Sequence, residues 1–205
     1  MLNKLRHITQ IKHSNEAKQS PPGQFITDRF PILTFGTTPA IELADWKFDI
    51  SGEIQQNLSL NWSRFLALAP LTINAEFHCV TQWSKLQNQW IGVSFKTIAE
   101  LVDINYEAQF VMIHCYGGYS TNLPLDILME NDVLFAHTHQ GEPLDRNHGG
   151  PLRLVVPKRY GWKSAKWVNG IEFMKEDAPG FWEVRGYHMN GDPWKEERWG
   201  KDLTY

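Results

Sequence analysis

The apolar residues of this chain fall into short runs that turn residues end, and this pattern most limits what the chain can fold into. Residues 46–50 alternate apolar and polar side chains before a Ser-Gly turn, as a half-buried strand does. Residues 110–114 are almost wholly apolar and precede paired glycines, which is typical of a buried strand. No run approaches the roughly 18 apolar residues of a membrane-spanning helix, so we expect no helix that crosses a membrane.

Other segments extend this pattern of short elements. Further strands are predicted at residues 71–79, 133–138, 152–156 and 166–173. Short helices are predicted at residues 65–68 after a cap at Asn61 or Ser63, at 97–102 after a cap at Ser94, and from Pro124 to about Met129. Because strands and helices do not alternate regularly, the predicted fold class is α+β, with mixed short strands and few short helices, rather than a doubly wound sheet.

Composition divides the chain into a tail and one domain. Residues 1–29 are polar, lack a sustained apolar period and end in a Ser-Pro-Pro-Gly breaker cluster, so they either form a mobile tail or wrap around the domain. Residues 30–205 form the predicted domain, and residues 181–205, rich in tryptophan and glycine, are expected to give it an irregular, aromatic-packed cover. The length of 205 residues suits one such domain.

Charge and cysteine content exclude several classes of protein. A net charge of −3 and a pI of about 6.2 argue against nucleic acid as the main partner, because phosphate binding needs a large positive field. Two cysteines cannot form a disulfide framework in a chain of this size. The N-terminal residues contain neither an apolar signal segment nor paired arginines, so we expect a cytoplasmic protein.

Each of the two cysteines follows a histidine near the end of a predicted strand. Cys79 and Cys115 both precede polar loops, where ligand-binding side chains are commonly presented. A thiolate there would serve as a nucleophile or a soft metal ligand, whereas a buried thiol would only fill the core. Adjacent strand residues point to opposite faces, so the pairs His78-Cys79 and His114-Cys115 make a weak case for a zinc site.

A second pair of histidines has period-two spacing. His137 and His139 would share one face of a strand, which is compatible with metal binding. Two half-buried, hydrogen-bonded histidines are the plainer interpretation of the same pattern. A zinc-dependent hydrolase using these histidines and one cysteine is therefore an alternative function.

The segment from His148 to Lys166 has the highest density of polar and charged groups that could bind a ligand. Gly149 and Gly150 allow backbone amides to approach a ligand closely, and Arg153 begins the following strand. Residues 164–166 then offer a hydroxyl, backbone amides and an ammonium group. The five cations between residues 153 and 166 suit a bound phosphate or diphosphate, although lysines defending a solvated edge strand would give the same composition.

Three segments together resemble the sulfite-oxidase-like family of molybdopterin-dependent oxidoreductases. They are residues 79–84 with 90–93, residues 118–125, and the long ordered segment 139–167. The resemblance extends over residues 30–194 and implies a sulfite-oxidase-type molybdopterin-binding domain with the molybdenum cofactor.

The resemblance also implies roles for individual residues. Cys79 matches the single protein ligand of the molybdenum, and Tyr187, five residues after Trp182, matches the active-site tyrosine. The residues that match cofactor contacts are His148, Arg153, Ser164, Ala165 and Lys166, with a further contact at Cys115 or Tyr116. The implied activity is oxygen-atom transfer to or from a small substrate. A catalytically inactive module that only binds the cofactor is an alternative.

Departures from the family pattern bear on the substrate and the partners. Leu33 stands where sulfite oxidases carry an arginine for the anionic substrate, and residues 82–84 replace arginines that follow the cysteine. Sulfite is therefore not expected to be the natural substrate. The sequence contains neither the haem domain nor the dimerisation domain of those relatives, so we expect a monomer and a separate electron-transfer partner.

Overall fold

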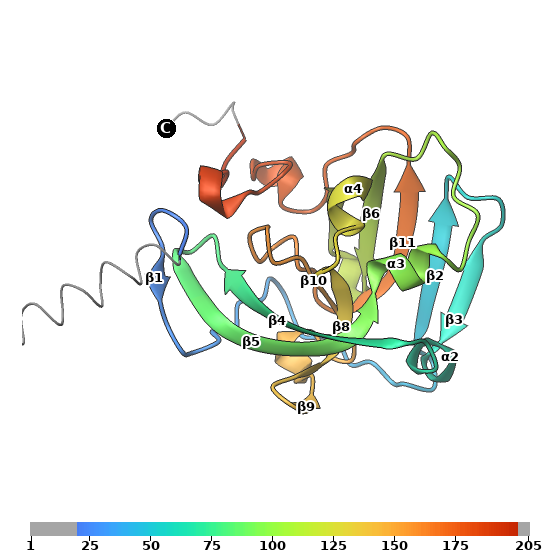
Figure 1. Ribbon diagram of the computed structural model, residues 1–205, viewed down its shortest axis with the longest axis horizontal. Coiled ribbons are helices and arrows are strands. Elements are labelled where there is room, and N and C mark those ends of the chain that lie inside the picture. Colours follow the sequence, from blue (N-terminus) through green and yellow to red (C-terminus); the bar gives the residue numbers. More distant parts are fainter. Residues whose placement is uncertain (1–19, 201–205) are drawn as a thin grey trace, which may run out of the picture.

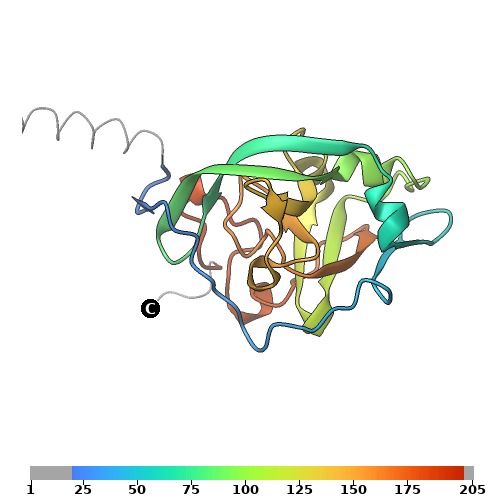
Figure 2. The ribbon, with the colours of Figure 1, turned by 90° about the horizontal axis from the view of Figure 1, so that it is seen from below.

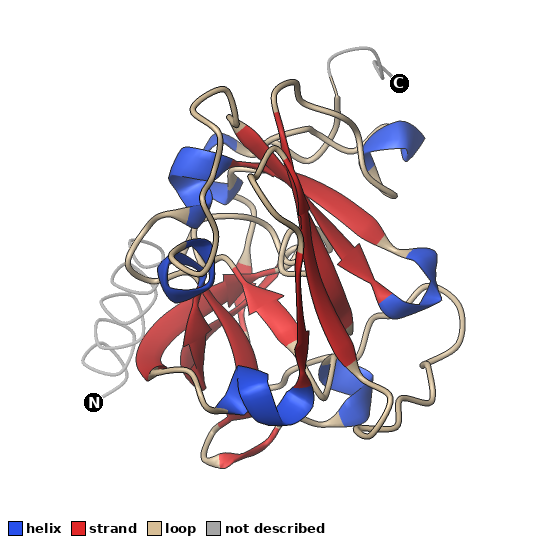
Figure 3. Cartoon of the chain, turned by 90° about the vertical axis from the view of Figure 1, so that its right-hand side faces the viewer, coloured by secondary structure: helices blue, strands red, loops and turns tan. Residues whose placement is uncertain are grey.

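The computed structural model describes residues 20–200. Figures 1 and 3 show two groups of strands with short helices at their ends. The six-stranded sheet, here sheet A, contains β1 (Phe25–Ile26), β4 (Pro70–His78), β5 (Trp83–Ser94), β8 (Leu134–His139), β9 (Glu142–Pro143) and β10 (Arg153–Val155). The five-stranded sheet, here sheet B, contains β2 (Lys47–Gly52), β3 (Leu58–Asn61), β6 (Phe110–Cys115), β7 (Ser120–Pro124) and β11 (Val168–Met174).

The helices are one or two turns long. They are α2 (Trp62–Leu66), α3 (Phe95–Ala99), α4 (Leu125–Leu128) and the 3₁₀ turns η1 (Tyr116–Gly118), η2 (Arg146–His148), η3 (Glu183–Arg185) and η4 (Pro193–Lys195). Asn61 caps α2 by accepting from the Arg64 amide at 2.9 Å, and Ser94 caps α3 in the same way at 3.0 Å from the Thr97 amide. In the described residues, no helix has the length and apolar content to cross a membrane.

The main core lies between the two sheets. Phe48 of sheet B and Phe135 of sheet A meet edge to face with ring centroids 5.0 Å apart, and both side chains are fully buried. Within sheet A the order is β1-β5-β8-β10, with β4 on β5 and β9 on β8; within sheet B it is β3-β2-β11-β6-β7. The predicted α+β class of a sulfite-oxidase-type domain is confirmed.

Strand β5 is the main element that the sequence interpretation omitted. Its 12 residues pair with β4 along most of its length and with β8 at its C-terminal end. Polar residues interrupt its apolar pattern between Trp83 and Trp90, so no short apolar run marks it. The β4–β5 pair forms the long ribbon in Figure 1, and the turn between the two strands carries Cys79.

The N-terminal segment from residue 20 onward, here called the N-terminal wrap, runs around the domain. Strand β1 pairs in parallel with β5 and lies before residue 30, where the domain was predicted to begin; residues 1–19 of the predicted tail lie outside the described residues. The segment continues along one side of the molecule, as the blue chain in Figure 2 shows. Phe30 in this segment packs edge to face on Phe77, with centroids 5.1 Å apart. Residues 25–27, from the described part of the predicted tail, are hydrogen-bonded to β5.

The C-terminal segment covers the domain through aromatic contacts. Trp182 and Tyr187 have ring centroids 4.9 Å apart, and Tyr187 meets Trp199 at the same distance. The backbone in this region forms only the short turns η3 and η4. The irregular aromatic cover predicted for this end of the chain is present as far as residue 200.

Acid should weaken the fold through His139. Burial, together with nearby positive charges, lowers the pKa of His139 from 6.5 to about 4, so the folded chain resists a proton that the unfolded chain binds. The free energy of unfolding should therefore fall as pH falls from about 6.5 to about 4. Urea unfolding at several pH values would measure the slope. His139→Gln should give a shallower slope, and an unchanged slope would contradict this assignment.

Candidate functional site

A cavity of about 360 Å³ brings most of the predicted site residues together. Segments far apart in sequence form its wall. They are the N-terminal wrap (between residues 30 and 35), the β4–β5 turn with its flanks (between 77 and 83), residues 148–167, and the C-terminal cover (between 181 and 187). The predicted residues that line it are Cys79, His148, Arg153, Ser164, Ala165, Lys166 and Tyr187. The motif residues therefore converge on one site.

Cys79 is presented by the tight turn that joins β4 to β5. The Cys79 amide donates to the Trp83 carbonyl at 2.8 Å, and the Gln82 amide donates to the Cys79 carbonyl at 3.1 Å. The Cys79 Sγ lies 3.1 Å from the Thr81 hydroxyl oxygen. Burial raises the pKa of the Cys79 thiol, while the Thr81 hydrogen bond and the positive charge of Arg198 oppose this rise. The turn thus holds the Cys79 thiol at the cavity wall.

Tyr187 lies in the same cavity within an aromatic frame. Its ring meets Trp162 nearly at a right angle, with centroids 5.0 Å apart, and Trp182 lies on another side. Burial and the nearby Cys79 raise the pKa of the Tyr187 hydroxyl above 10. The hydroxyl therefore remains protonated at neutral pH and can donate a hydrogen bond into the cavity.

Arg153 is a buried cation that ties two loops together. Its Nη1 donates to the His148 carbonyl at 2.8 Å, and its Nη2 donates to the Ser164 carbonyl at 2.9 Å. Gly149 permits this packing, because a Cβ at that position would lie 3.0 Å from the Cβ atoms of both Arg153 and Lys166. Burial lowers the pKa of Arg153 to about 9, and its buried Nε has no hydrogen-bond partner within residues 20–200.

Lys166 adds a second cation to the same wall. Its Nζ donates to the Thr34 hydroxyl at 2.8 Å and to the Asn147 carbonyl at 2.7 Å. Burial, and then the charge of Arg153, lowers the pKa of Lys166 to about 8. Neither cation forms an ion pair with a carboxylate among the described residues. A buried Arg153 and a half-buried Lys166, neither in a direct ion pair within the described residues, are the kind of donor set that an anionic group requires.

A profile of the family described as "Oxidoreductase molybdopterin binding domain" matches residues 35–182, more than half of the chain. The chain belongs to this family. It is an oxidoreductase of the molybdopterin class and binds the molybdenum cofactor. Arg153 and Lys166, which form no direct ion pair with a carboxylate in the described residues, fit the anionic phosphate of that cofactor, and Cys79 lines the same cavity.

Several relatives of known description agree with this membership. The uncharacterized oxidoreductase YuiH of Bacillus subtilis is 42% identical over 96% of this chain and 100% of its own length. The methionine-sulfoxide reductase catalytic subunit MsrP of Campylobacter jejuni is 30% identical over 83% of this chain, and sulfite oxidase of Arabidopsis thaliana is 29% identical over 79%. The chain spans 64% and 50% of the lengths of these two proteins.

A solved structure supports the same fold. The sulfane dehydrogenase SoxCD of Paracoccus pantotrophus superimposes with a TM-score of 0.63 over 68% of this chain and 40% of that protein. At 20% sequence identity the likeness concerns the arrangement of strands and helices alone. The molybdopterin fold predicted from the motifs therefore has an independent structural match.

The structure places Cys115 apart from the other predicted cofactor residues. Cys115 ends β6, belongs to the core between the sheets and is only 6% exposed, so its sulfur does not line the cavity. Burial raises the pKa of its thiol well above the ordinary value. The alternative, Tyr116, uses its hydroxyl to accept from the Lys47 amide and does not line the cavity either. Gly117 and Tyr119 supply this part of the wall instead.

The N-terminal wrap supplies wall residues that the sequence analysis did not assign to the site. Phe30 stacks on His148 with ring centroids 4.5 Å apart, and the Phe30 carbonyl lies 3.0 Å from the His148 Nε2. Thr34 holds Lys166, as described above. No motif marks either residue, and both lie beyond the predicted tail of residues 1–29, so no local signal indicated these contacts.

The histidines considered for a zinc site are hydrogen-bonded instead. His139 Nε2 lies 3.1 Å from the Asn88 amide oxygen, and its ring lies 4.2 Å from the Trp90 ring. His137 Nδ1 lies 2.9 Å from the Thr138 hydroxyl. Within residues 20–200 no group of three or more His, Cys, Asp or Glu side chains could hold a metal ion. The zinc-hydrolase alternative thus has no support in this part of the chain.

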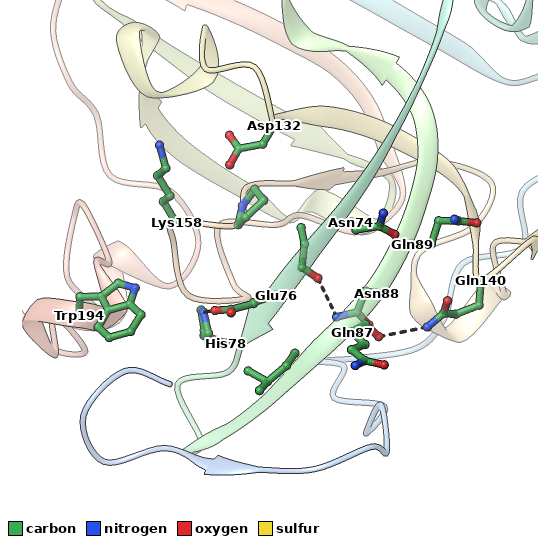
Figure 4. A pocket seen from close by; sticks show the side chains of 13 residues that line it. Asn74, Glu76, His78, Gln87, Asn88, Gln89, Asp132, Gln140, Lys158 and Trp194 are labelled. Atoms are coloured by element: carbon green, nitrogen blue, oxygen red, sulfur yellow. Dashed lines mark hydrogen bonds and ion pairs between the residues drawn. The ribbon is translucent and has the colours of Figure 1, made fainter. Parts of the chain in front are cut away.

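A second cavity of about 710 Å³ lies along the β4–β5 ribbon, and Figure 4 shows its polar lining. His78 faces it and lies 3.2 Å from Glu76, whereas the adjacent Cys79 lines the first cavity. The two neighbours therefore point to different cavities, as expected for successive strand residues. Cys79 and Tyr187 do not line this second cavity.

Proposed function

We propose that the protein transfers an oxygen atom to or from a small substrate at a molybdenum that the Cys79 thiolate ligates. The observation that carries this proposal is the single cavity shared by Cys79, Tyr187 and the two cations Arg153 and Lys166. The thiol, the phenol and the anion-binding groups that the family chemistry needs are thereby assembled around one space.

Each residue has a distinct role in this proposal. The cofactor supplies the two-electron chemistry when bound. Cys79 would hold the metal, and the protonated Tyr187 hydroxyl would donate a hydrogen bond to a bound substrate. His148, Arg153, Lys166 and the backbone at Ser164 and Ala165 orient the anionic part of the cofactor. The aromatic rings of Trp162 and Trp182 hold the Tyr187 ring in place.

The cavity lining argues against sulfite as the natural substrate. Leu33, which replaces the substrate arginine of sulfite oxidases, lines the cavity. Among the described lining residues the only lysine or arginine side chains are Arg153 and Lys166, and both already bind neighbouring loops. A dianionic substrate would therefore lack a cation of its own, so we propose a substrate with little or no negative charge. The electrons would pass to or from a separate protein partner.

Metal and pterin analysis of protein purified from a host that makes the cofactor tests the proposal. The expected result is nearly one molybdenum and one pterin per chain, with reversible reduction by dithionite and reoxidation by an oxidant. Bound cofactor that cannot be cycled would identify an inactive cofactor-binding module instead. Zinc at one equivalent without molybdenum would refute the proposal.

Arg153→Ala should lower cofactor occupancy at least several-fold, because the variant removes a buried cation and the bonds to the loops at His148 and Ser164. Molybdenum content per folded chain, with folding checked by circular dichroism, is the measurement. Lys166→Met should also lower occupancy without cutting the loop-to-loop bonds of Arg153. Arg64→Ala on the exposed side of α2 is the control and should retain full occupancy. Full occupancy in both cavity variants would contradict the assigned role.

A further inference from the structure

Two segments remote in sequence hold the turn that carries Cys79. The Gln24 side-chain amide donates to the Cys79 carbonyl at 3.1 Å, from the N-terminal wrap. The Arg198 Nη1 donates to the Val80 carbonyl at 2.5 Å, from the C-terminal cover. The carbonyl of a residue inside a tight turn normally faces water, so a buried guanidinium on Val80 is a specific attachment.

Arg198 is itself firmly placed. Its side chain is 12% exposed, and its Cζ lies 4.9 Å from the centre of the Tyr160 ring. Its backbone carbonyl accepts from the His188 amide at 3.2 Å, and the adjoining residues Tyr187 and Trp199 form an antiparallel bridge. The backbone that fixes Arg198 therefore also fixes the tyrosine of the cavity.

The charge of Arg198 is only weakly neutralised. Among the residues that the structure describes, the nearest carboxylate oxygen, Glu196 Oε1, lies 4.0 Å from Nη2, and none of these residues hydrogen-bonds to that buried Nη2. The positive charge lies close enough to act on the Cys79 sulfur. In a water-poor interior such a charge acts more strongly on a neighbouring anion than it would at the surface.

We infer that Arg198 is a positioning residue of the candidate active site, which holds the Cys79 turn through the Val80 carbonyl and places a permanent positive charge behind the thiolate. The inference rests on the proposed ligation of molybdenum by Cys79. Arg198 does not line the cavity, so it acts through the turn and not on the substrate. The positive charge stabilises the more electron-rich state of the site, which makes reduction easier.

The test compares two variants. Arg198→Met has a side chain of similar length but removes both the positive charge and the hydrogen bond to Val80. Arg198→Lys keeps the positive charge but loses the planar guanidinium group. Lys195→Met is the matched control, because Lys195 belongs to the same segment and is largely exposed. The rate of amide hydrogen exchange at residues 80–83 measures how firmly Arg198 holds the turn. A redox titration of the molybdenum signal in the cofactor-loaded protein gives the midpoint potential, which measures the effect of the Arg198 charge.

Arg198→Met should speed exchange at residues 80–83 about tenfold or more and shift the midpoint potential to a more negative value, with molybdenum content unchanged. Arg198→Lys should restore the potential more fully than it restores the exchange rate, and Lys195→Met should match the wild type. Wild-type exchange and potential in Arg198→Met would overturn the inference. Equal potentials in the Lys and Met variants would overturn the role of the charge. If the wild type binds no molybdenum, the proposed function fails, whereas the exchange rates still decide whether Arg198 holds the turn.

Discussion

Cys79→Ser is expected to abolish turnover while most of the pterin stays bound. A serine hydroxyl is a hard ligand that does not replace a soft thiolate on this metal, so the loss of activity should be several orders of magnitude. The proposed anchors His148, Arg153 and Lys166 remain in the variant, and they should retain the cofactor. Turnover with an artificial electron donor or acceptor, together with pterin content, measures both effects.

Cys115→Ser provides the matched control for this substitution. Cys115 is the only other cysteine of the chain and lies in the core between the sheets. Its replacement should lower stability moderately, because a buried polar group is introduced, and should leave the cofactor chemistry intact. Loss of turnover in Cys115→Ser with normal turnover in Cys79→Ser would show that the wrong cysteine had been assigned.

Lys163→Met is expected to lower the free energy of unfolding by roughly 3–5 kcal/mol. The Lys163 Nζ lies 2.7 Å from the Glu183 Oε1, and both side chains are completely buried. The same carboxylate oxygen accepts from the Thr121 hydroxyl at 3.0 Å and from the Trp162 indole at 2.9 Å. Removing the ammonium would leave a buried negative charge without its cation. Urea or guanidinium unfolding measures the loss.

An exposed ion pair supplies the control for the buried one. Lys158 lies 2.6 Å from Glu130 but is 57% exposed, so Lys158→Met should cost less than about 1 kcal/mol. The buried pair also joins two segments that line the cavity, because Lys163 belongs to residues 148–167 and Glu183 belongs to the C-terminal cover. Equal, small losses for the two variants would contradict this account of the buried pair.

Local sequence signals predicted several of the short elements. Asn61 and Ser94 are helix caps because each side chain acts on an amide three residues away, which is a property of the local sequence. The alternation of residues 46–50 likewise predicted β2 from neighbouring residues alone. Such contacts need no knowledge of the rest of the fold.

Contacts between distant segments could not be predicted in the same way. Strand β5 is defined by its partners β4 and β8 and not by an apolar run. Phe30 reaches His148 across 118 positions, and Arg198 reaches Val80 across the same separation. Cys115 is the last residue of β6 and Cys79 directly follows β4, so their places in the sequence are alike. Only the packing of the two sheets makes one a core sulfur and the other a cavity sulfur.

X-ray absorption at the molybdenum edge tests the central claim most directly, because it counts the sulfur atoms bound to the metal. The measurement compares the wild-type protein with Cys79→Ser and Cys115→Ser at matched cofactor content. The account predicts one fewer sulfur neighbour in Cys79→Ser and an unchanged metal environment in Cys115→Ser. An unchanged sulfur count in Cys79→Ser would contradict it.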